Sequence, residues 1–375
     1  MATFDFLVVG SGIAGASVAA SLAAKASVAL VERETAHGYH TTGRSAALYA
    51  ASYGNEAIRA ITRASRAFFD NPPEGFAAHP ILSPRGCLYI ARQDQLASLQ
   101  ALCDGSLASG VPVERIGEAE ARGFCPVLRP GYVVQAGYEP TAMDIDVDAL
   151  HQGYLRQVRT LGGDIRLEAE LVGLERVGGA WAARLANGET LTAKVVIDAA
   201  GAWADRVASL AGAKPVGLTP LKRTAVLLDE PPGVISRGWP AVIDADEQFY
   251  FKPEAGKILA SPADETPSEP HDAFSDEMDV AICIDRVQQA ADIPVRRVGR
   301  SWAGLRTFAP DRIPVIGCDP VVEGFFWLAG QGGYGVQTAP AAGRLAAALA
   351  MGEPLPEDLT ALGLRAETLS PARFS

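Results

Sequence analysis

The sequence has few of the residues that hold metals and disulfides: its 375 residues contain five cysteines and five histidines. The cysteines form no CxxC pair, and the histidines show neither HxxxH nor HExxH spacing. An odd number of unpaired cysteines argues against a disulfide framework and against a zinc site. We therefore expect no metal site and a reducing, cytoplasmic location.

Positive charge is also scarce. Lys and Arg number 33 against 44 Asp and Glu, which gives a formal net charge of −11 at pH 7. Such a chain repels a phosphate backbone, so nucleic acid is not an expected partner. With 48% hydrophobic and 21% charged residues, the composition is that of a globular chain long enough to form two domains.

The chain lacks a continuous membrane-length hydrophobic run. Residues 6–24 are almost free of charge, but Gly10, Gly12 and Gly15 interrupt them, and Asp5 precedes them in place of a basic start. We therefore expect neither a transmembrane segment nor a signal peptide.

A strand–turn–helix–strand pattern occupies the beginning of the chain. Residues 4–9 have the composition of a buried strand and lead into the sequence GSGIAG at 10–15. An alanine-rich helix is predicted over 16–24 and a second strand over 28–31, which ends at Glu32. This is the context that a GxGxxG motif requires to bind a dinucleotide.

Each residue of the motif has a physical role in that interpretation. Gly10 permits the tight turn, Gly12 lets a pyrophosphate approach the backbone, and Gly15 lets helix and strand pack closely. The helix N-terminus attracts the phosphates. Glu32 can accept hydrogen bonds from ribose hydroxyls and disfavours a 2′-phosphate. The alternative is a glycine-rich turn in an unrelated α/β protein.

A second glycine-rich sequence, GQGGYG at 330–335, follows an apolar strand predicted over 325–329 and precedes an alanine-rich helix predicted over 343–350. Too little chain follows it for another complete nucleotide unit. We interpret it as a close approach of backbone to a ligand, with the helix dipole directed at an electron-rich group. A plain strand-to-helix loop is the alternative.

Two further segments, together with the strand–GxGxxG–Glu32 unit and GQGGYG, carry a family resemblance. After Glu32 comes a polar loop that contains GRSAA at 43–47, where a simple NAD dehydrogenase would continue with its next βα unit, and DAAGAW follows at 198–203. In this order, with GQGGYG at 330–335, the motifs resemble the D-amino acid oxidase/glycine oxidase superfamily of FAD enzymes (DAO family). The resemblance is closest to its D-arginine dehydrogenase-like bacterial branch and runs over essentially the whole chain.

The expected fold class is α/β (α+β), with two interleaved domains. A Rossmann-like FAD-binding domain with a parallel sheet is expected from residues 1–80, 146–212 and 313–375. A substrate-binding domain on a mainly antiparallel sheet is expected from residues 81–145 and 213–312, where short strand-like runs are separated by Pro and Gly turns. The ligand would lie between the two domains.

The resemblance implies that FAD is bound noncovalently. Cys318 is the only candidate for a thioether, but it stands too close to Gly330 for that arrangement, and we expect it to be buried and inert. The expected cofactor-binding residues are Gly10, Gly12, Ile13, Ala14, Gly15, Glu32, Arg33, Thr42, Gly43, Arg44, Ser45, Ala46, Val172, Ala200, Gly201, Trp203, Gly304, Gly330, Gly332, Gly333, Tyr334 and Gly335.

The resemblance also implies the substrate contacts. Arg306 and Arg223 match the positions that hold the substrate carboxylate, and two planar guanidinium groups could clamp it. Tyr250 matches a donor to the same carboxylate, Tyr53 matches a phenol over the amine, and the carbonyl of Gly333 matches the amine acceptor. Without the resemblance, the arginines would be solvated surface residues and the tyrosines amphipathic core residues. No side chain stands out as a general base.

Two departures from the arginine-handling branch bear on specificity. Cys87 stands where that branch has an acidic residue, and Leu48 stands where it has a histidine. Together with Ala241 and Ile243, these residues would line an apolar side-chain pocket. A guanidinium buried there would lack a partner, so D-arginine and D-lysine should be poor substrates.

The sequence therefore predicts oxidative deamination of neutral or hydrophobic D-amino acids, with the D preference implied by the resemblance. The electron acceptor could be O₂, a quinone or another carrier, and a quinone would allow membrane association of a cytoplasmic protein. Two alternatives stay open: oxidation of a secondary amine or imino acid, such as an N-methyl amino acid or D-proline, and a flavoprotein that binds amino acids without turnover.

Overall fold

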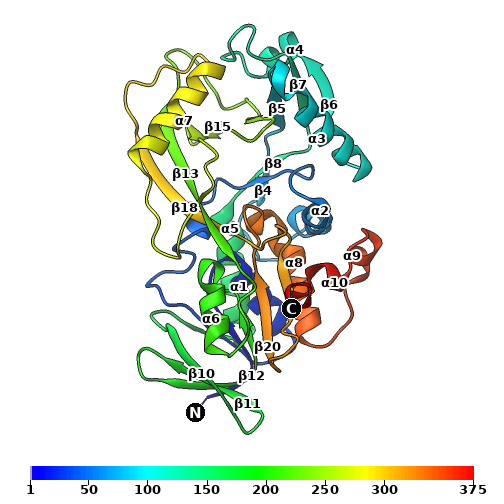
Figure 1. Cartoon of the computed structure of the whole chain (residues 1–375), viewed down its shortest axis with the longest axis vertical. Helices are drawn as coiled ribbons and strands as arrows, with labels where there is room; N and C mark the ends of the chain where they lie inside the picture. The colour runs from blue at the N-terminus through cyan, green and yellow to red at the C-terminus, as the bar shows by residue number, and fades with distance from the viewer. Residues whose placement is uncertain (1) are drawn as a thin grey trace.

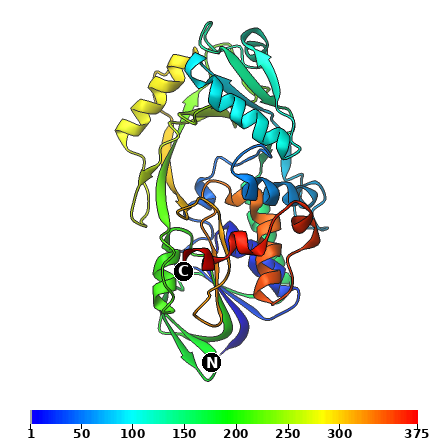
Figure 2. The same ribbon diagram turned by 45° about the vertical axis from the view of Figure 1, so that its right-hand side comes forward.

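The structure, a computed structural model, describes residues 2–375. Two large sheets lie at opposite ends of an elongated molecule, with helices packed on their faces (Figures 1 and 2). The chain crosses between the two sheets several times, so segments far apart in sequence share each sheet.

The first sheet has eight strands in the order β10-β11-β12-β1-β2-β9, with β20 paired to β12 and β19 paired to β20. The central pairs β12–β1, β1–β2, β2–β9 and β12–β20 are parallel, whereas β10–β11, β11–β12 and β19–β20 are antiparallel. The strands are β1 (Thr3–Val9), β2 (Val28–Val31), β9 (Asp164–Arg166), β10 (Leu171–Val177), β11 (Ala180–Leu185), β12 (Thr190–Asp198), β19 (Val315–Cys318) and β20 (Phe325–Ala329).

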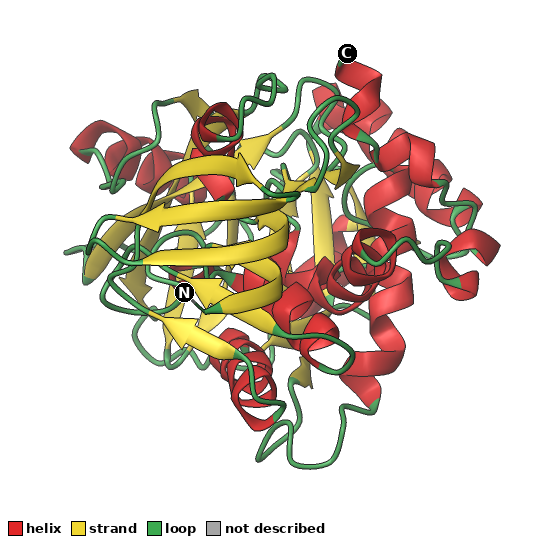
Figure 3. Cartoon of the chain, turned by 90° about the horizontal axis from the view of Figure 1, so that it is seen from below, coloured by secondary structure: helices red, strands yellow, loops and turns green. Residues whose placement is uncertain are grey.

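Alternating side chains of these buried strands form a core on each face of the first sheet. Phe6, Val8 and Leu30 pack on the face that carries most of the helices, whereas Leu7 and Val9 pack on the opposite face. Figure 3 shows the helices gathered beside the strands. The helices of this part are α1 (Ile13–Ala23), α2 (Glu56–Asp70), α5 (Val147–Thr160), α6 (Ala204–Leu210), α8 (Gly335–Ala350), α9 (Glu357–Ala361) and α10 (Ala366–Leu369).

The second sheet has nine strands in the order β17-β13-β16-β15-β14-β5-β7-β6, with β18 paired to β13. All of its pairs are antiparallel except β14–β5. The strands are β5 (Cys87–Ala91), β6 (Glu114–Gly117), β7 (Gln135–Glu139), β13 (Thr219–Asp229), β14 (Ala241–Asp244), β15 (Tyr250–Glu254), β16 (Lys257–Ser261), β17 (Thr266–Pro267) and β18 (Arg300–Phe308).

The remaining elements are three helices beside the second sheet, four 3₁₀ turns in both parts of the fold and a small third sheet. Helices α3 (Leu96–Ala108), α4 (Glu118–Phe124) and α7 (Glu277–Ala290) pack near the second sheet, and four 3₁₀ turns cover Thr42–Arg44, Gln93–Gln95, Gly201–Trp203 and Pro371–Phe374. A third, three-stranded sheet joins β3 (Leu48–Tyr49), β8 (Met143–Ile145) and β4 (Leu82–Pro84).

The predicted fold class is confirmed, because a largely parallel sheet and a mainly antiparallel sheet are built from interleaved segments. Strands of the first sheet all come from 1–80, 146–212 and 313–375, and those of the second from 81–145 and 213–312. The three-stranded sheet nevertheless pairs β3, from residues 1–80, with β8, from residues 81–145. Where the two domains divide therefore stays a prediction.

The late helix begins earlier than the sequence indicated: α8 starts at Gly335, directly after the glycine-rich loop, and contains Pro340. Gly343, taken as the first helical residue, instead lies in its middle. A Cβ at Gly343 would lie 2.7 Å from the Ser17 hydroxyl oxygen and 2.8 Å from the Ser17 backbone carbon. The glycine therefore permits close packing of α8 on α1.

Candidate functional site

A long cavity runs from the ends of β1 and β2 toward β13, β15 and β18 of the second sheet. Parallel strands β1 and β2 and the segment after β12 meet at one edge of the first sheet, where Gly10, Glu32 and Ala200 line the cavity. Ligands of open α/β sheets bind at this carboxyl edge.

The first glycine-rich turn has the geometry that its motif requires. Gly10 has φ +97°, and a Cβ there would lie 2.6 Å from the Ala199 carbonyl oxygen. A Cβ on Gly15 would lie 1.8 Å from the Gly10 carbonyl oxygen, so Gly15 serves packing between β1 and α1. Gly12 lines the cavity immediately before α1, whose first N–H groups have no intrahelical partner. This turn fits a pyrophosphate.

Glu32 is held in place on the cavity wall by three donors. Its Oε2 accepts hydrogen bonds from the Ser11 backbone N–H at 2.8 Å and from the Ser11 hydroxyl at 2.9 Å, and its Oε1 accepts from the Glu34 N–H at 3.0 Å. The side chain is 9% exposed and lines the cavity. A carboxylate fixed in this way suits a pair of ribose hydroxyls.

Two further residues stand behind Ser11. His37 Nδ1 lies 2.9 Å from the Ser11 hydroxyl oxygen, and Arg159 Nη2 lies 3.2 Å from His37 Nε2. Burial, then the charge of Arg159, lowers the pKa of His37. A neutral His37 can accept from Arg159 and donate to Ser11, which in turn donates to Glu32. The chain of donors therefore supports the orientation of the Glu32 carboxylate.

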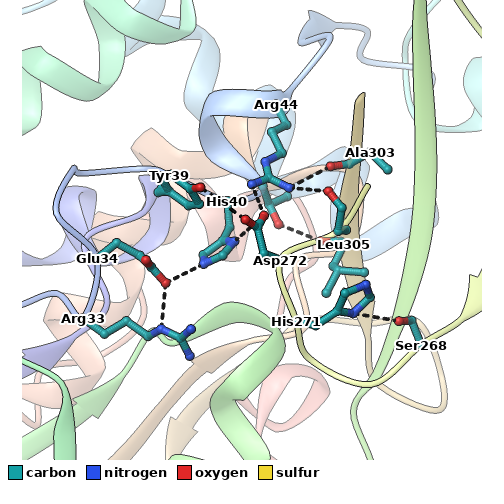
Figure 4. Close-up of polar contacts among 12 residues, drawn as sticks. Arg33, Glu34, Tyr39, His40, Arg44, Ser268, His271, Asp272, Ala303 and Leu305 are labelled. Atoms are coloured by element: carbon teal, nitrogen blue, oxygen red, sulfur yellow. Dashed lines mark hydrogen bonds and ion pairs between the residues drawn. The ribbon is translucent and has the colours of Figure 1, made fainter. Parts of the chain in front are cut away.

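Arg44 ties the segment after β2 to the second sheet (Figure 4). Its guanidinium donates to the carbonyl oxygens of Ala273 at 2.8 Å and Ala303 at 3.0 Å, and it pairs with the Asp272 carboxylate. In return, the Trp302 indole N–H donates to the Arg44 carbonyl oxygen at 3.0 Å. The GRSAA segment therefore forms part of the cavity wall, and Arg44 fixes it to the second part of the fold by both donating and accepting hydrogen bonds.

Neighbouring residues extend this network (Figure 4). The Thr41 hydroxyl donates to the Leu305 carbonyl oxygen at 2.7 Å, and the Tyr39 hydroxyl donates to Asp272 at 3.2 Å. His40 Nε2 lies 2.8 Å from a Glu34 oxygen. These contacts place His40 and Tyr39 on the cavity wall, although no local pattern in the sequence indicated either residue.

Strand register brings the candidate substrate residues to one face of the second sheet. Across β13 and β18, Leu221 pairs with Arg306 and Arg223 pairs with Gly304, so both arginine side chains lie on the same face. Tyr250 begins β15 and lines the cavity beside both arginines. The structure therefore places three of the predicted substrate contacts on one wall.

Arg306 lies directly against the second glycine-rich loop. A Cβ at Gly333 would lie 2.8 Å from Arg306 Nη1, so a larger residue at 333 would displace the guanidinium. Within residues 2–375, Arg306 forms no ion pair with a carboxylate. A cation on a cavity wall without an anionic partner suits an anionic ligand group.

Arg223 is 7% exposed and is already partnered in part. Its Nε donates to the Asp264 carbonyl oxygen at 2.8 Å, and its Nη2 lies 3.3 Å from Glu265, which also pairs with Arg312 at 2.8 Å. Arg223 lines this cavity on one side and a second cavity, lined mostly by charged residues, on the other. Its charge toward a substrate is therefore partly neutralised.

Tyr53 lies near this wall without lining the cavity. Its hydroxyl is 3.4 Å from a Glu247 carboxylate oxygen, and its ring centroid is 4.9 Å from that of Tyr334. Burial, then the charge of Glu247, raises the pKa of Tyr53, and burial also raises the pKa of Tyr334. Both phenols therefore stay protonated at neutral pH.

Most of the predicted site residues line the cavity. Those that do are Gly10, Gly12, Ile13, Ala14, Glu32, Arg33, Thr42, Arg44, Ser45, Ala46, Val172, Ala200, Gly201, Trp203, Arg223, Tyr250, Gly304, Arg306, Gly332, Gly333 and Gly335. Those that do not are Gly15, Gly43, Leu48, Tyr53, Cys87, Ala241, Ile243, Gly330 and Tyr334.

The four residues of the expected side-chain pocket come together in one apolar cluster with Tyr53. Cys87 and Ala241 pair across β5 and β14, but they are 0% and 4% exposed and lie outside the cavity lining. Burial, then the charge of Glu139, raises the pKa of the Cys87 thiol. The cluster lies beside the substrate wall, and its role in specificity stays a prediction.

Cys318 corrects one expectation, because its side chain is exposed and not buried. It ends β19, which pairs with β20 alone and has no strand on its other side. Cys318 does not line the cavity. Among residues 2–375, no cluster of His, Cys, Asp and Glu is arranged to hold a metal, and no helix is long and apolar enough to cross a membrane.

Sequence reasoning missed several lining residues that reach the cavity from distant segments. Apart from Gln331, which lies in GQGGYG, they belong to none of the glycine-rich motifs, and strand pairing and loop packing bring them to the site. They include Gly38, Tyr39, His40, Thr41, Ala169, Glu170, Arg206, Leu210, Ala225, Leu305, Thr307 and Gln331.

Comparison with known proteins agrees with this geometry. A family model described as FAD dependent oxidoreductase (DAO) matches residues 5–349. Glycine oxidase of Geobacillus kaustophilus is 25% identical over 253 residues, which cover 64% of this chain and 62% of that protein. Hydrogen cyanide synthase subunit HcnC of Pseudomonas aeruginosa is 26% identical over 218 residues, covering 56% and 49%. The chain thus spans about half to two thirds of these relatives.

Solved structures share the fold over nearly the whole chain. The crystal structure of glycine oxidase from Geobacillus kaustophilus superposes with a TM-score of 0.83 at 23% identity, covering 94% of this chain and 96% of that one. That of L-proline dehydrogenase from P. horikoshii gives a TM-score of 0.83 at 22% identity, covering 100% and 98%.

Proposed function

Because the chain belongs to the family of FAD-dependent oxidoreductases, we propose that it deaminates D-amino acids oxidatively, with a preference for neutral or hydrophobic side chains. The observation that carries the proposal is Arg306, a cavity-wall guanidinium without a carboxylate partner in the described chain, packed against Gly333. Its counterpart would be the substrate carboxylate.

The cofactor in this proposal is FAD, on which the family depends. The turn at Gly10–Gly15, the fixed Glu32 carboxylate and the wall formed by Arg44 would hold its pyrophosphate, its ribose and the edge of its ring system. Bound FAD supplies the acceptor for the hydride of the substrate.

The residues of the chain would then bind and orient the amino acid. Arg306 would hold the carboxylate together with the Tyr250 hydroxyl, and Arg223 would add a charge that Glu265 partly neutralises. The carbonyl of Gly333 would accept a hydrogen bond from the amine. Cα–H would then face the flavin, lose its hydride, and leave an imino acid that water converts to a 2-oxo acid and ammonia.

The proposed side-chain preference rests on the apolar cluster of Leu48, Cys87, Ala241 and Ile243 beside Tyr53. A cationic side chain directed there would not pair with Glu139, because that carboxylate is 0% exposed and its oxygens already accept hydrogen bonds. The electron acceptor, O₂, a quinone or another carrier, and a cytoplasmic location belong to the same proposal.

A substrate panel tests the proposal. We expect neutral D-amino acids such as leucine, methionine and phenylalanine to bleach the oxidised flavin under anaerobic conditions. The kcat/KM for D-arginine should be at least about tenfold lower, because its guanidinium would lose a hydrogen-bond partner on binding. Absorbance of the purified yellow protein reports the reaction, and the L-enantiomers serve as controls. Admission of air then shows whether O₂ is an acceptor.

Other outcomes of the panel point elsewhere. Bleaching by D-proline or an N-methyl amino acid alone would favour a secondary amine substrate, a class represented among the fold relatives by iminodiacetate oxidase from Chelativorans sp. BNC1. A higher kcat/KM for D-arginine than for every neutral D-amino acid would contradict the predicted pocket. A flavin that no amine reduces would indicate a binding protein.

The pH dependence follows from the same residues. We expect kcat/KM to rise with pH as the substrate ammonium loses its proton, because no side chain at the site is placed as a general base. Burial raises the pKa of Tyr53 above its usual value near 10, so this donor keeps its proton and no falling limb should occur below about pH 10. A stopped-flow profile with D-leucine checks this, and a flat profile would contradict it.

A further inference from the structure

Glu139 is a buried carboxylate for which the proposed reaction has no direct use. It ends β7 and is 0% exposed. Its Oε1 accepts hydrogen bonds from the Ala51 N–H at 2.9 Å and the Thr141 hydroxyl at 3.5 Å, and its Oε2 accepts from the Ser52 hydroxyl. In the described part of the chain it forms no ion pair, so burial raises its pKa. Such a group is costly to bury without a cation.

The donors of Glu139 belong to the turn that leads to Tyr53. Ala51 and Ser52 directly precede Tyr53, whose N–H donates to the Ala50 carbonyl oxygen at 3.2 Å. The Tyr89 hydroxyl lies 2.8 Å from the Ser52 hydroxyl oxygen. Since Ser52 donates its proton to Glu139, its oxygen is free to accept from Tyr89. Two strands of the second sheet thus hold one residue of the turn.

A second buried side chain holds the same turn from the opposite direction. The Ala50 N–H donates to Gln337 Oε1 at 3.1 Å, and Gln337 Nε2 donates to the Thr62 hydroxyl at 3.0 Å. Gln337 belongs to α8 and is 3% exposed. The backbone before Tyr53 is therefore fixed by one polar group from α8 and one from β7.

We propose that Glu139 is a positioning residue, which holds the turn at 50–52 and thereby sets the Tyr53 phenol against Arg306 and the substrate amine. The Tyr53 phenol contacts the exposed Glu247 at 3.4 Å and also interacts with the Arg306 guanidinium. The backbone of the turn, which Glu139 helps to fix, brings the phenol within reach of Arg306. This inference rests on the proposed function, because a role of Tyr53 over the substrate amine, which the family resemblance implies, requires an amino acid substrate.

A direct contact between Glu139 and a cationic substrate side chain is the competing interpretation. The strand register is compatible with such a contact, because Glu139 pairs across β7 and β5 with Cys87, a residue of the expected side-chain pocket. The carboxylate, however, is fully buried behind Ser52 and Tyr89, and both of its oxygens already accept hydrogen bonds. Its effect should therefore be equal for neutral and cationic substrates.

The first test measures the turn itself. Glu139→Met removes both acceptors at similar volume, and Glu139→Gln keeps an oxygen for the Ala51 N–H. We expect amide hydrogen exchange of a peptide containing Ala51 and Ser52 to become at least about tenfold faster in the FAD-loaded Met variant and to be partly restored in the Gln variant. The control is Glu114→Gln, an exposed carboxylate on the adjacent strand β6.

The second test measures ligand binding. 2-Aminoisobutyrate has no Cα–H and cannot be oxidised, so its binding can be followed by the flavin spectrum. We expect Glu139→Met and Ser52→Ala to raise its Kd about tenfold, to raise KM for D-leucine and D-arginine by equal factors, and to change kcat less than threefold. In a protein that already carries Tyr53→Phe, Glu139→Met should raise the Kd of 2-aminoisobutyrate and the KM values little further, because both substitutions act through the Tyr53 hydroxyl.

The outcomes separate the two proposals. A wild-type protein that responds to no amine or amino acid refutes the proposed function and, with it, a role of Glu139 at the substrate. If the wild type responds, unchanged exchange at 50–52, losses that multiply in the double variant, or a loss confined to D-arginine would each overturn the positioning role. Accelerated exchange together with an equal, Tyr53-dependent loss supports it.

Discussion

Replacing Arg306 by methionine is expected to lower kcat/KM for a neutral D-amino acid by about a thousandfold, because a buried charge pair that loses one partner costs about 4 kcal/mol. The substrate carboxylate would face a cavity wall without its main cation. Arg223 cannot replace it, since Glu265 already partly neutralises that charge. Anaerobic stopped-flow reduction of the flavin measures the effect.

Two comparisons sharpen this prediction. Arg306→Lys keeps the charge but loses the planar pair of donors, so an intermediate loss of about ten- to hundredfold is expected. Arg300→Met changes an exposed arginine of the same strand and should leave kcat/KM within about twofold. If Arg306→Met retained a tenth of the wild-type kcat/KM, a residue other than Arg306 would have to hold the substrate carboxylate.

Replacing Glu32 by alanine is expected to raise the Kd of FAD about a hundredfold, because two hydrogen bonds from ribose hydroxyls to a carboxylate are lost, each worth about 1.5 kcal/mol. The substitution also leaves the Ser11 N–H without its acceptor on the cavity wall. The Kd of FAD is measured for the wild type and for Glu32→Ala by titrating each apoprotein with FAD and monitoring the quenching of flavin fluorescence.

The control for this prediction is Glu175→Ala, which removes an exposed carboxylate from β10 of the same sheet. It should leave the Kd of FAD unchanged within about twofold. If Glu32→Ala bound FAD as tightly as the wild type, the ribose would lie away from the carboxyl end of β2, and the orientation assigned to the dinucleotide would be wrong.

The nucleotide end was predictable from sequence because its signals are local. Strand, glycine turn and helix follow one another within the first residues, and Gly15 is required by a contact inside that unit, with the Gly10 carbonyl. The fold class followed from the same unit together with strand-like runs separated by turns. Its confirmation reflects short-range periodicity and motif spacing.

The substrate end was harder to predict, because long-range register determines it. Arg306 and Arg223 share one face only because β13 and β18 pair in the observed register, which no local pattern encodes. Their selection came from family resemblance. The same register puts Cys87 in a closed cluster, and it hides Glu139, whose importance depends on a turn that lies 88 residues away in sequence.

Through the network around Arg44, we expect FAD binding to be energetically coupled to the contacts that join the two sheets. Arg44 is anchored on Asp272, Ala273 and Ala303 of the second half, while neighbouring Thr42 donates no such contact and instead accepts from the Ile13 N–H in the nucleotide unit. A ligand that contacts both halves favours the arrangement that joins them by as much as it binds that arrangement more tightly than a separated one. By reciprocity, a substitution that loosens the second sheet from this segment is expected to weaken the binding of FAD, even when it lies far from every atom that touches FAD.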